Sequence, residues 1–205
     1  MDKWNTRIAR KYVVFANQQK DYSVEQCERM LYALNVILSE MEKMIALCLI
    51  ALIFGVFNYF LLAVVVVLSL RVTMGGMHRK TFWGCFLFSL CFFSSVIVLS
   101  KYVIAGWKVT NLILYGIYVI YIYFRAPIPS ATRPVFSVQR KKRLKVYAFV
   151  VITGWISVCY LFQGNGVWIN CIEWTLLLHI VEILFVEGGR ALWQKTRLLR
   201  KSVNS

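Results

Sequence analysis

His78 and Cys85 are the two side chains in this sequence whose types and spacing could carry out nucleophilic chemistry. A cysteine thiolate attacks carbonyl carbon, and an imidazole nearby can take up and return the proton. On one continuous helix, residues seven apart are separated by about 10 Å along the axis, which is too far for direct proton transfer. The chain must therefore bend near His78 if the two side chains are to meet.

The residues around this pair permit such a bend. Gly75 and Gly76 stand just before the histidine and tolerate unusual backbone angles. Thr81 is a predicted N-cap, which would place Cys85 in the first turns of a helix, where the dipole favours an anion. The spacing alone also fits a cysteine that only packs within a membrane helix and a histidine that is only solvated at the membrane surface. From the residues alone, both interpretations stay open.

The composition indicates an integral membrane protein. Hydrophobic residues make up 60% of the 205 residues, whereas a soluble domain has about 45–50%. They are gathered in long runs without charge, as membrane helices require. The net charge of +15 does not indicate nucleic-acid binding, because no basic segment comes with a soluble fold to carry it. We expect contact with membrane lipid and no nucleic acid.

The predicted fold class is an all-α polytopic membrane protein with about six transmembrane helices and an N-terminal amphipathic helix in the membrane interface. The interfacial helix is indicated by Trp4, Ile8, Tyr12 and Phe15, which form one apolar stripe surrounded by basic residues. Ser23 is a predicted cap for the next helix. The whole chain, 1–205, is predicted to be a single membrane domain with the following segments: 1–22, interfacial helix; 24–70, amphipathic helix and first hairpin, turning at Gly55 and Asn58; 71–81, cytoplasmic loop with His78; 82–124, third and fourth spans; 125–145, basic cytoplasmic loop; 146–187, last hairpin, turning at 163–166; 188–205, basic cytoplasmic tail.

The distribution of Lys and Arg predicts the orientation. With a cytoplasmic N-terminus and six spans, all 24 Lys and Arg residues except Lys101 and Lys108 lie in segments that face the cytoplasm. Positive charge collects on the cytoplasmic side of membrane proteins. Both termini are therefore predicted to be cytoplasmic.

Further charged residues stand out in two places. One is the basic cluster, formed by Arg140, Lys141, Lys142, Arg143 and Lys145, which could hold an acidic ligand, anchor the topology or contact anionic lipid. The other is the last span, which contains Glu173, His179 and Glu182; ionisable groups inside a membrane usually face protein or water. The six cysteines form no CxxC pair, so we expect no metal site and no cofactor.

The stretch around the His–Cys pair resembles the signature of the accessory gene regulator B (AgrB) family of membrane-embedded cysteine peptidases. The resemblance rests on Arg71, Gly75, Gly76, His78 and Cys85, and extends to the proline-containing basic segment "APIPSATRPVFSVQRKKRLK" and to "MLYALNVILSEMEKMI". Where the family commonly has Tyr-Gly, this chain has Tyr32-Ala33, and Ala is the better helix former.

The resemblance implies a bacterial cell-membrane enzyme that processes the precursor of a cyclic quorum-sensing peptide. Cys85 and His78 would be the catalytic residues: the thiolate attacks near the C-terminal end of the precursor, releases its acidic tail and keeps a thioester, which closes to a thiolactone or lactone. Gly75, Gly76 and Arg71 would support the site or bind substrate; ordinary snorkelling of Arg71 is the other interpretation. Arg140, Lys141, Lys142 and Arg143 would hold the acidic tail. The family also suggests a homodimer.

Two other classes of function remain possible from the residues. A small membrane transporter or exporter would explain the ionisable groups of the last span, although no internal repeat is visible. A non-catalytic membrane scaffold would use the basic segments to recruit a partner.

Overall fold

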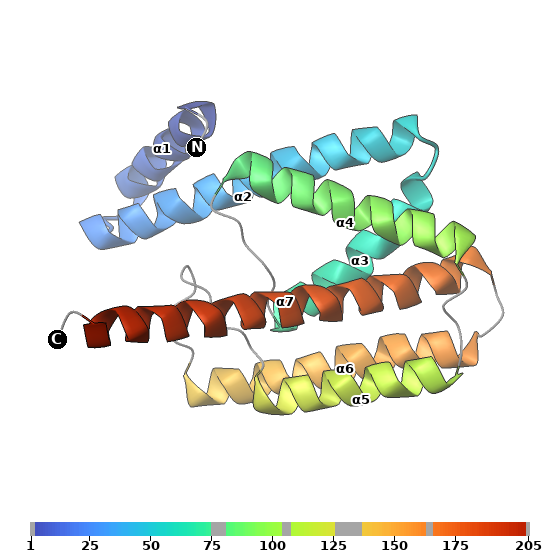
Figure 1. Cartoon of the computed structure of the whole chain (residues 1–205). Coiled ribbons are helices and arrows are strands. Elements are labelled where there is room, and N and C mark those ends of the chain that lie inside the picture. Colours follow the sequence, from blue (N-terminus) through green and yellow to red (C-terminus); the bar gives the residue numbers. More distant parts are fainter. Residues whose placement is uncertain (1–2, 75–80, 104–107, 126–136, 163–165, 204–205) are drawn as a thin grey trace. The chain divides into compact units, whose positions relative to one another are not determined.

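The computed structural model describes residues 3–74, 81–103, 108–125, 137–162 and 166–203. Within these ranges the chain is helical and has no strand (Figure 1). The helices are α1 (Lys3–Gln19), α2 (Val24–Ile53), α3 (Phe57–Met74), α4 (Phe82–Tyr102), α5 (Lys108–Phe124), α6 (Val138–Leu161) and α7 (Val167–Val203). The all-α class predicted from the sequence is therefore confirmed.

Four of the described helical segments are long and apolar enough to cross a membrane. They are Phe57–Met74, Phe82–Tyr102, Val138–Leu161 and Val167–Phe185, and a shorter apolar helix covers Asn111–Phe124. The membrane class follows from these segments, because about 20 apolar residues span a bilayer. The number of six spans stays a prediction.

The helices form two compact units. The first unit contains α1, α2 and the start of α4 up to Cys91; the second contains α3 from Asn58, the rest of α4, and α5, α6 and α7.

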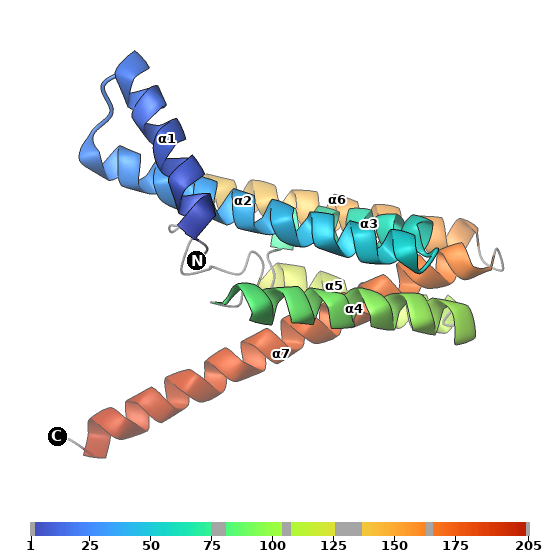
Figure 2. The same cartoon turned by 90° about the horizontal axis from the view of Figure 1, so that it is seen from above.

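In the first unit, α1 folds back over α2 (Figure 2). Asn5, Ala9 and Val13 lie at steps of four on α1 and are buried. The amide of Asn5 donates to a carboxylate oxygen of Glu42 at 2.9 Å. The predicted apolar stripe of α1 lies on the other side and is exposed, so it is available to the membrane interface, where we expect it.

Local signals fix the ends of α2. The Ser23 hydroxyl accepts from the backbone of Gln26, and the Gln26 side chain accepts from the backbone of Ser23, which is a capping box. The predicted Ser23 cap is confirmed, and such caps are worth about 1 kcal/mol. After Ile53 the chain turns at Gly55, whose φ of 64° suits glycine. Asn58, predicted to share the turn, instead lies in the first turn of α3.

The second unit has a continuous apolar core. Tyr118 of α5, Ile152 of α6 and Leu176 of α7 are fully buried in it, together with Leu70 and Met74 of α3. Each helix contributes side chains that recur every three or four residues, so one face of each helix is buried. The last turns of α3 are therefore part of this core.

Two predicted loop boundaries were wrong. We expected a loop from residue 71, but α3 continues to Met74. We also expected a basic loop up to residue 145, but α6 begins at Val138, so the basic cluster is helical. The Ser137 hydroxyl accepts from the backbone N–H of Arg140 at 3.3 Å and starts the helix there. The helix α7 continues to Val203, beyond residue 187, where we expected the last span to end, and the apolar part of α7 that could cross a membrane is Val167–Phe185. Lys and Arg are good helix formers, so a helix can continue through a basic stretch. The charges mark where the apolar part of the helix ends, and the helix itself extends further.

Candidate functional site

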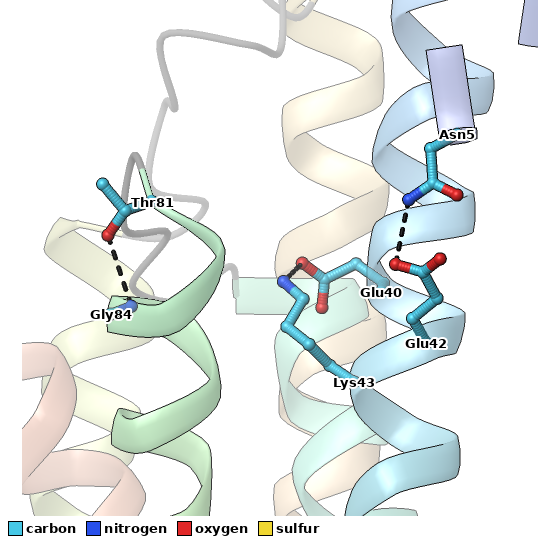
Figure 3. Close-up of polar contacts among 6 residues, drawn as sticks. All are labelled: Asn5, Glu40, Glu42, Lys43, Thr81 and Gly84. Carbon is cyan, nitrogen blue, oxygen red and sulfur yellow. Dashed lines mark hydrogen bonds and ion pairs between the residues drawn. The ribbon is translucent and has the colours of Figure 1, made fainter. Parts of the chain in front are cut away.

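Cys85 lies in the first turns of α4, directly after the predicted cap. The Thr81 hydroxyl accepts from the backbone N–H of Gly84 at 3.3 Å (Figure 3). The backbone carbonyl of Thr81 accepts from the N–H of Cys85 at 3.1 Å. The predicted Thr81 cap is therefore confirmed, and the nucleophile candidate lies where the helix dipole favours negative charge.

The Cys85 thiol is free and buried, with 9% of the residue exposed. The surrounding turn is aromatic: Phe82, Trp83 and Phe86 contact one another through their rings. An apolar surround of this kind limits the access of water to a thioester at this position.

The first turn of α4 also limits which backbone groups could stabilise an oxyanion. A helix leaves its first N–H groups without intrahelical acceptors. Here Gly84 and Cys85 donate to Thr81, so Phe82 and Trp83 carry the N–H groups that helix geometry leaves for a substrate oxygen. The cap thus leaves the N–H groups of Phe82 and Trp83 as the candidate oxyanion donors.

His78, Gly75 and Gly76 lie outside the described residues. The contact between His78 and Cys85 therefore stays a prediction, as do the roles of the two glycines.

A buried lysine of α2 lies against the start of α4 and was missed in the sequence. Lys43 is 6% exposed and forms an ion pair with Glu40 (Figure 3). Its ammonium lies 5.7 Å from the centre of the Phe82 ring. A cation over a ring face is attractive. The signal was present: Lys43 is a lone cation directly before the uncharged run from Met44 to Leu70.

Arg71, the first residue of the signature, makes an ion pair within the second unit. Its Nη2 lies 2.9 Å and 3.0 Å from the two carboxylate oxygens of Glu182 on α7. The sequence singled out both residues but did not pair them.

The other two ionisable groups of the last span also have partners. Asn111 of α5 donates to Glu173 at 2.7 Å, and the Tyr118 hydroxyl lies 3.1 Å from Nδ1 of His179 while donating to the carbonyl of Leu176. Both groups are buried. These contacts join α7 to α5 and give Glu173 and His179 a packing role.

The basic cluster lies on the first two turns of α6 and is exposed through Arg143. Lys145 differs from the rest because its ammonium donates to the backbone carbonyl of Tyr123 at 2.6 Å, which ties α6 to the end of α5. Arg140 and Arg143 line an open hollow on the helix surface, together with Ser137, Gln139, Leu144 and Tyr147.

Comparison with known proteins assigns the chain to a family. The model of the family described as accessory gene regulator B matches residues 6–183. An AgrB-like protein of Clostridium beijerinckii is 29% identical over 156 residues, which cover 76% of this chain and 75% of the relative. An AgrB-like protein of Clostridium perfringens (strain 13 / Type A) is 24% identical over 178 residues, covering 84% of this chain and 92% of the relative. No solved structure matches the chain. The chain therefore belongs to the accessory gene regulator B family.

Proposed function

We propose that this protein is a membrane-embedded cysteine endopeptidase that removes the C-terminal tail of a quorum-sensing peptide precursor and promotes its cyclisation. Family membership implies a role in the processing of such peptides. The observation that carries the finer proposal is the position of Cys85, a free thiol in the capped first turns of an apolar helix.

In the proposed reaction, the Cys85 thiolate attacks a backbone carbonyl near the C-terminal end of the precursor. The carbonyl oxygen becomes an oxyanion, for which the N–H groups of Phe82 and Trp83 are the candidate donors. His78 takes the thiol proton and gives it to the leaving amine, so the C–N bond breaks, the tail departs and a thioester remains on Cys85.

Cyclisation follows from the thioester without an external energy source. A thiol or hydroxyl within the substrate attacks the thioester carbon, the bond to Cys85 breaks, and the proton passes to the Cys85 sulfur through His78. Exchange between a thioester and a thiol is nearly isoenergetic, so it needs no ATP. Hydrolysis is the competing reaction, and the buried position of Cys85 among aromatic rings opposes it.

The basic cluster of α6 is the proposed contact for the acidic tail of the precursor. Its members Arg140 to Arg143 are exposed on a capped helix, where they can pair with carboxylates. Anionic lipid would contact the same charges. We propose that the enzyme acts at the bacterial cell membrane as a homodimer with both termini in the cytoplasm.

A transporter is the alternative function that the ionisable residues of the last span indicated in the sequence. The contacts of Glu173 with Asn111, and of Glu182 with Arg71, explain these groups as links between helices. The peptidase is therefore the function that the described contacts support best.

The proposal is tested by co-expression with the precursor and mass measurement of the products. Cys85→Ala and His78→Ala should each abolish cleavage, because one removes the nucleophile and the other the base. Cys91→Ala is the matched control, since Cys91 lies six residues further on the same helix and is exposed. Membrane levels of all variants are measured by immunoblot. Cleavage by both Cys85→Ala and His78→Ala would overturn the assignment.

A further inference from the structure

The ion pair between Arg71 and Glu182 joins two residues that are 111 positions apart in the chain. Both carboxylate oxygens of Glu182 lie within hydrogen-bond distance of one guanidinium nitrogen, at 2.9 Å and 3.0 Å. The Glu182 side chain is 2% exposed and that of Arg71 is 27% exposed. The pair thus joins the end of α3 to the middle of α7, with the carboxylate buried and the guanidinium partly exposed.

A buried ion pair of this kind is weak support for stability by itself. Removing two charges from water costs free energy that their attraction only partly returns, and apolar side chains of similar size often stabilise as well. What the pair does supply is a fixed geometry, because one guanidinium nitrogen of Arg71 lies within hydrogen-bond distance of both carboxylate oxygens of Glu182. The role of the ion pair is therefore best inferred from its position in the fold.

Arg71 lies in the last turn of α3, which ends at Met74. His78 follows four residues after Met74. Leu70 and Met74, on either side of Arg71, are fully buried in the core of the second unit. The ion pair therefore adds an oriented polar contact to a turn that packing already holds. Together they fix the point from which the chain continues toward His78.

We propose that Glu182 is a positioning residue of the peptidase: through its ion pair with Arg71, it fixes the last turn of α3 and so the start of the segment that carries His78. This inference rests on the proposed function. It assigns Arg71 an internal partner, because both carboxylate oxygens of Glu182 lie within hydrogen-bond distance of its Nη2.

Cleavage kinetics of four variants test this proposal. Glu182→Gln keeps the size of the side chain and removes its charge, and should lower kcat by about tenfold or more with KM changed less than about twofold. Arg71→Gln should give the same pattern. The exchanged pair, Arg71→Glu with Glu182→Arg, should recover most of the lost kcat, since it restores an ion pair between the same two helices. Glu173→Gln is the matched control: it neutralises a buried carboxylate on α7 that contacts α5 instead of α3, and kcat should stay close to wild type.

Direct contact of Arg71 with the substrate predicts a different set of results. If Arg71 contacts the substrate directly, Glu182→Gln frees the guanidinium and should lower KM, and the exchanged pair should stay inactive because a glutamate would then face the substrate. Either outcome overturns the proposal. Equal loss of kcat in Glu173→Gln would also overturn it, since any disturbance of α7 would then suffice.

A second measurement does not depend on cleavage. A nitroxide spin label is placed at Val72, which is 63% exposed on the last turn of α3, in a variant without native cysteines. Glu182→Gln should increase the mobility of the label, and the exchanged pair should restore it. Unchanged spectra in Glu182→Gln contradict the positioning role. If wild-type protein cleaves no precursor while the spectra behave as expected, the proposed function fails and the contact itself stands.

Discussion

At the scale of single residues, the Thr81 cap is the contact that determines how α4 begins beside Cys85. The Thr81 hydroxyl accepts a hydrogen bond from the N–H of Gly84, and the Thr81 carbonyl accepts one from the N–H of Cys85. The direction of the first turn, and with it the position of the thiol, depends on this residue.

Thr81→Val should therefore impair cleavage more than stability. The substitution keeps the shape of the side chain and removes the hydroxyl, which costs about 1 kcal/mol for a lost cap. We expect kcat to fall several-fold while the protein still inserts into the membrane, because small displacements of a nucleophile are costly. Steady-state cleavage of the precursor measures the effect.

Thr81→Ser is the control for that variant, since serine retains the hydroxyl and is an equally good cap. It should retain nearly full activity. Equal activity of Thr81→Val and wild type would show that the cap does not position Cys85.

The sequence predicted those residue contacts that depend on neighbours in the chain. The caps at Ser23 and Thr81 have local signatures, so both could be identified before the structure. The pair of Arg71 with Glu182 has no local signature, because only the packing of α3 on α7 brings the two together. The contact of Lys43 with Phe82 has no local signature either, because the ring belongs to α4, although the isolated position of Lys43 before the uncharged run is visible in the sequence.

At the scale of elements, α6 divides the basic cluster between two sides of one helix. Arg140, Arg143 and Tyr147 recur at steps of three and four and share one side. Lys141 and Lys145 share another, and Lys145 is bound to the end of α5. The cluster therefore offers the arginine side to a ligand.

Arg140→Gln with Arg143→Gln should raise KM for the precursor and leave kcat nearly unchanged, because the proposed contact holds the tail and takes no part in bond breaking. Lys141→Gln with Lys142→Gln is the control that removes the same charge, and its effect should be smaller. Kinetics at two salt concentrations and with a precursor whose tail is neutralised measure the contribution of charge. An equal rise of KM in both pairs would contradict a one-sided contact.

Element boundaries show where sequence reasoning was insufficient. The apolar stretches located the candidate spans, because hydropathy alone determines which segments can enter a bilayer. They did not locate the start of α6 or the end of α7, because Lys- and Arg-rich segments continue a helix as readily as apolar ones. The part from Val138 to Lys145 was therefore expected in a loop and is helical.

At the scale of the whole molecule, the distribution of charge predicts the orientation in the membrane. It places the segments before α4 and before α6 in the cytoplasm, and the segments after α4 and after α6 outside. The structure supplies exposed positions at both predicted surfaces, namely Tyr102 and Phe162 outside and Ser137 inside.

Cysteines introduced at these positions, in a variant without native cysteines, should therefore differ in labelling. Tyr102→Cys and Phe162→Cys should react with an impermeant maleimide in intact cells, and Ser137→Cys only after the membrane is opened. Labelling is read by gel shift. Reaction of Ser137→Cys in intact cells would reverse the predicted orientation.

The hydrogen bond between Asn5 and Glu42 has a consequence for the depth of α2. If α1 lies among the lipid headgroups, this bond holds Glu42 at the same level. From Glu42 to the end of α2 at Ile53 the helix rises only about 16 Å, roughly half of a hydrocarbon layer of about 30 Å. The turn at Gly55 would then lie near the middle of the bilayer, as the tip of a re-entrant hairpin. In that arrangement α2 would not cross the bilayer completely.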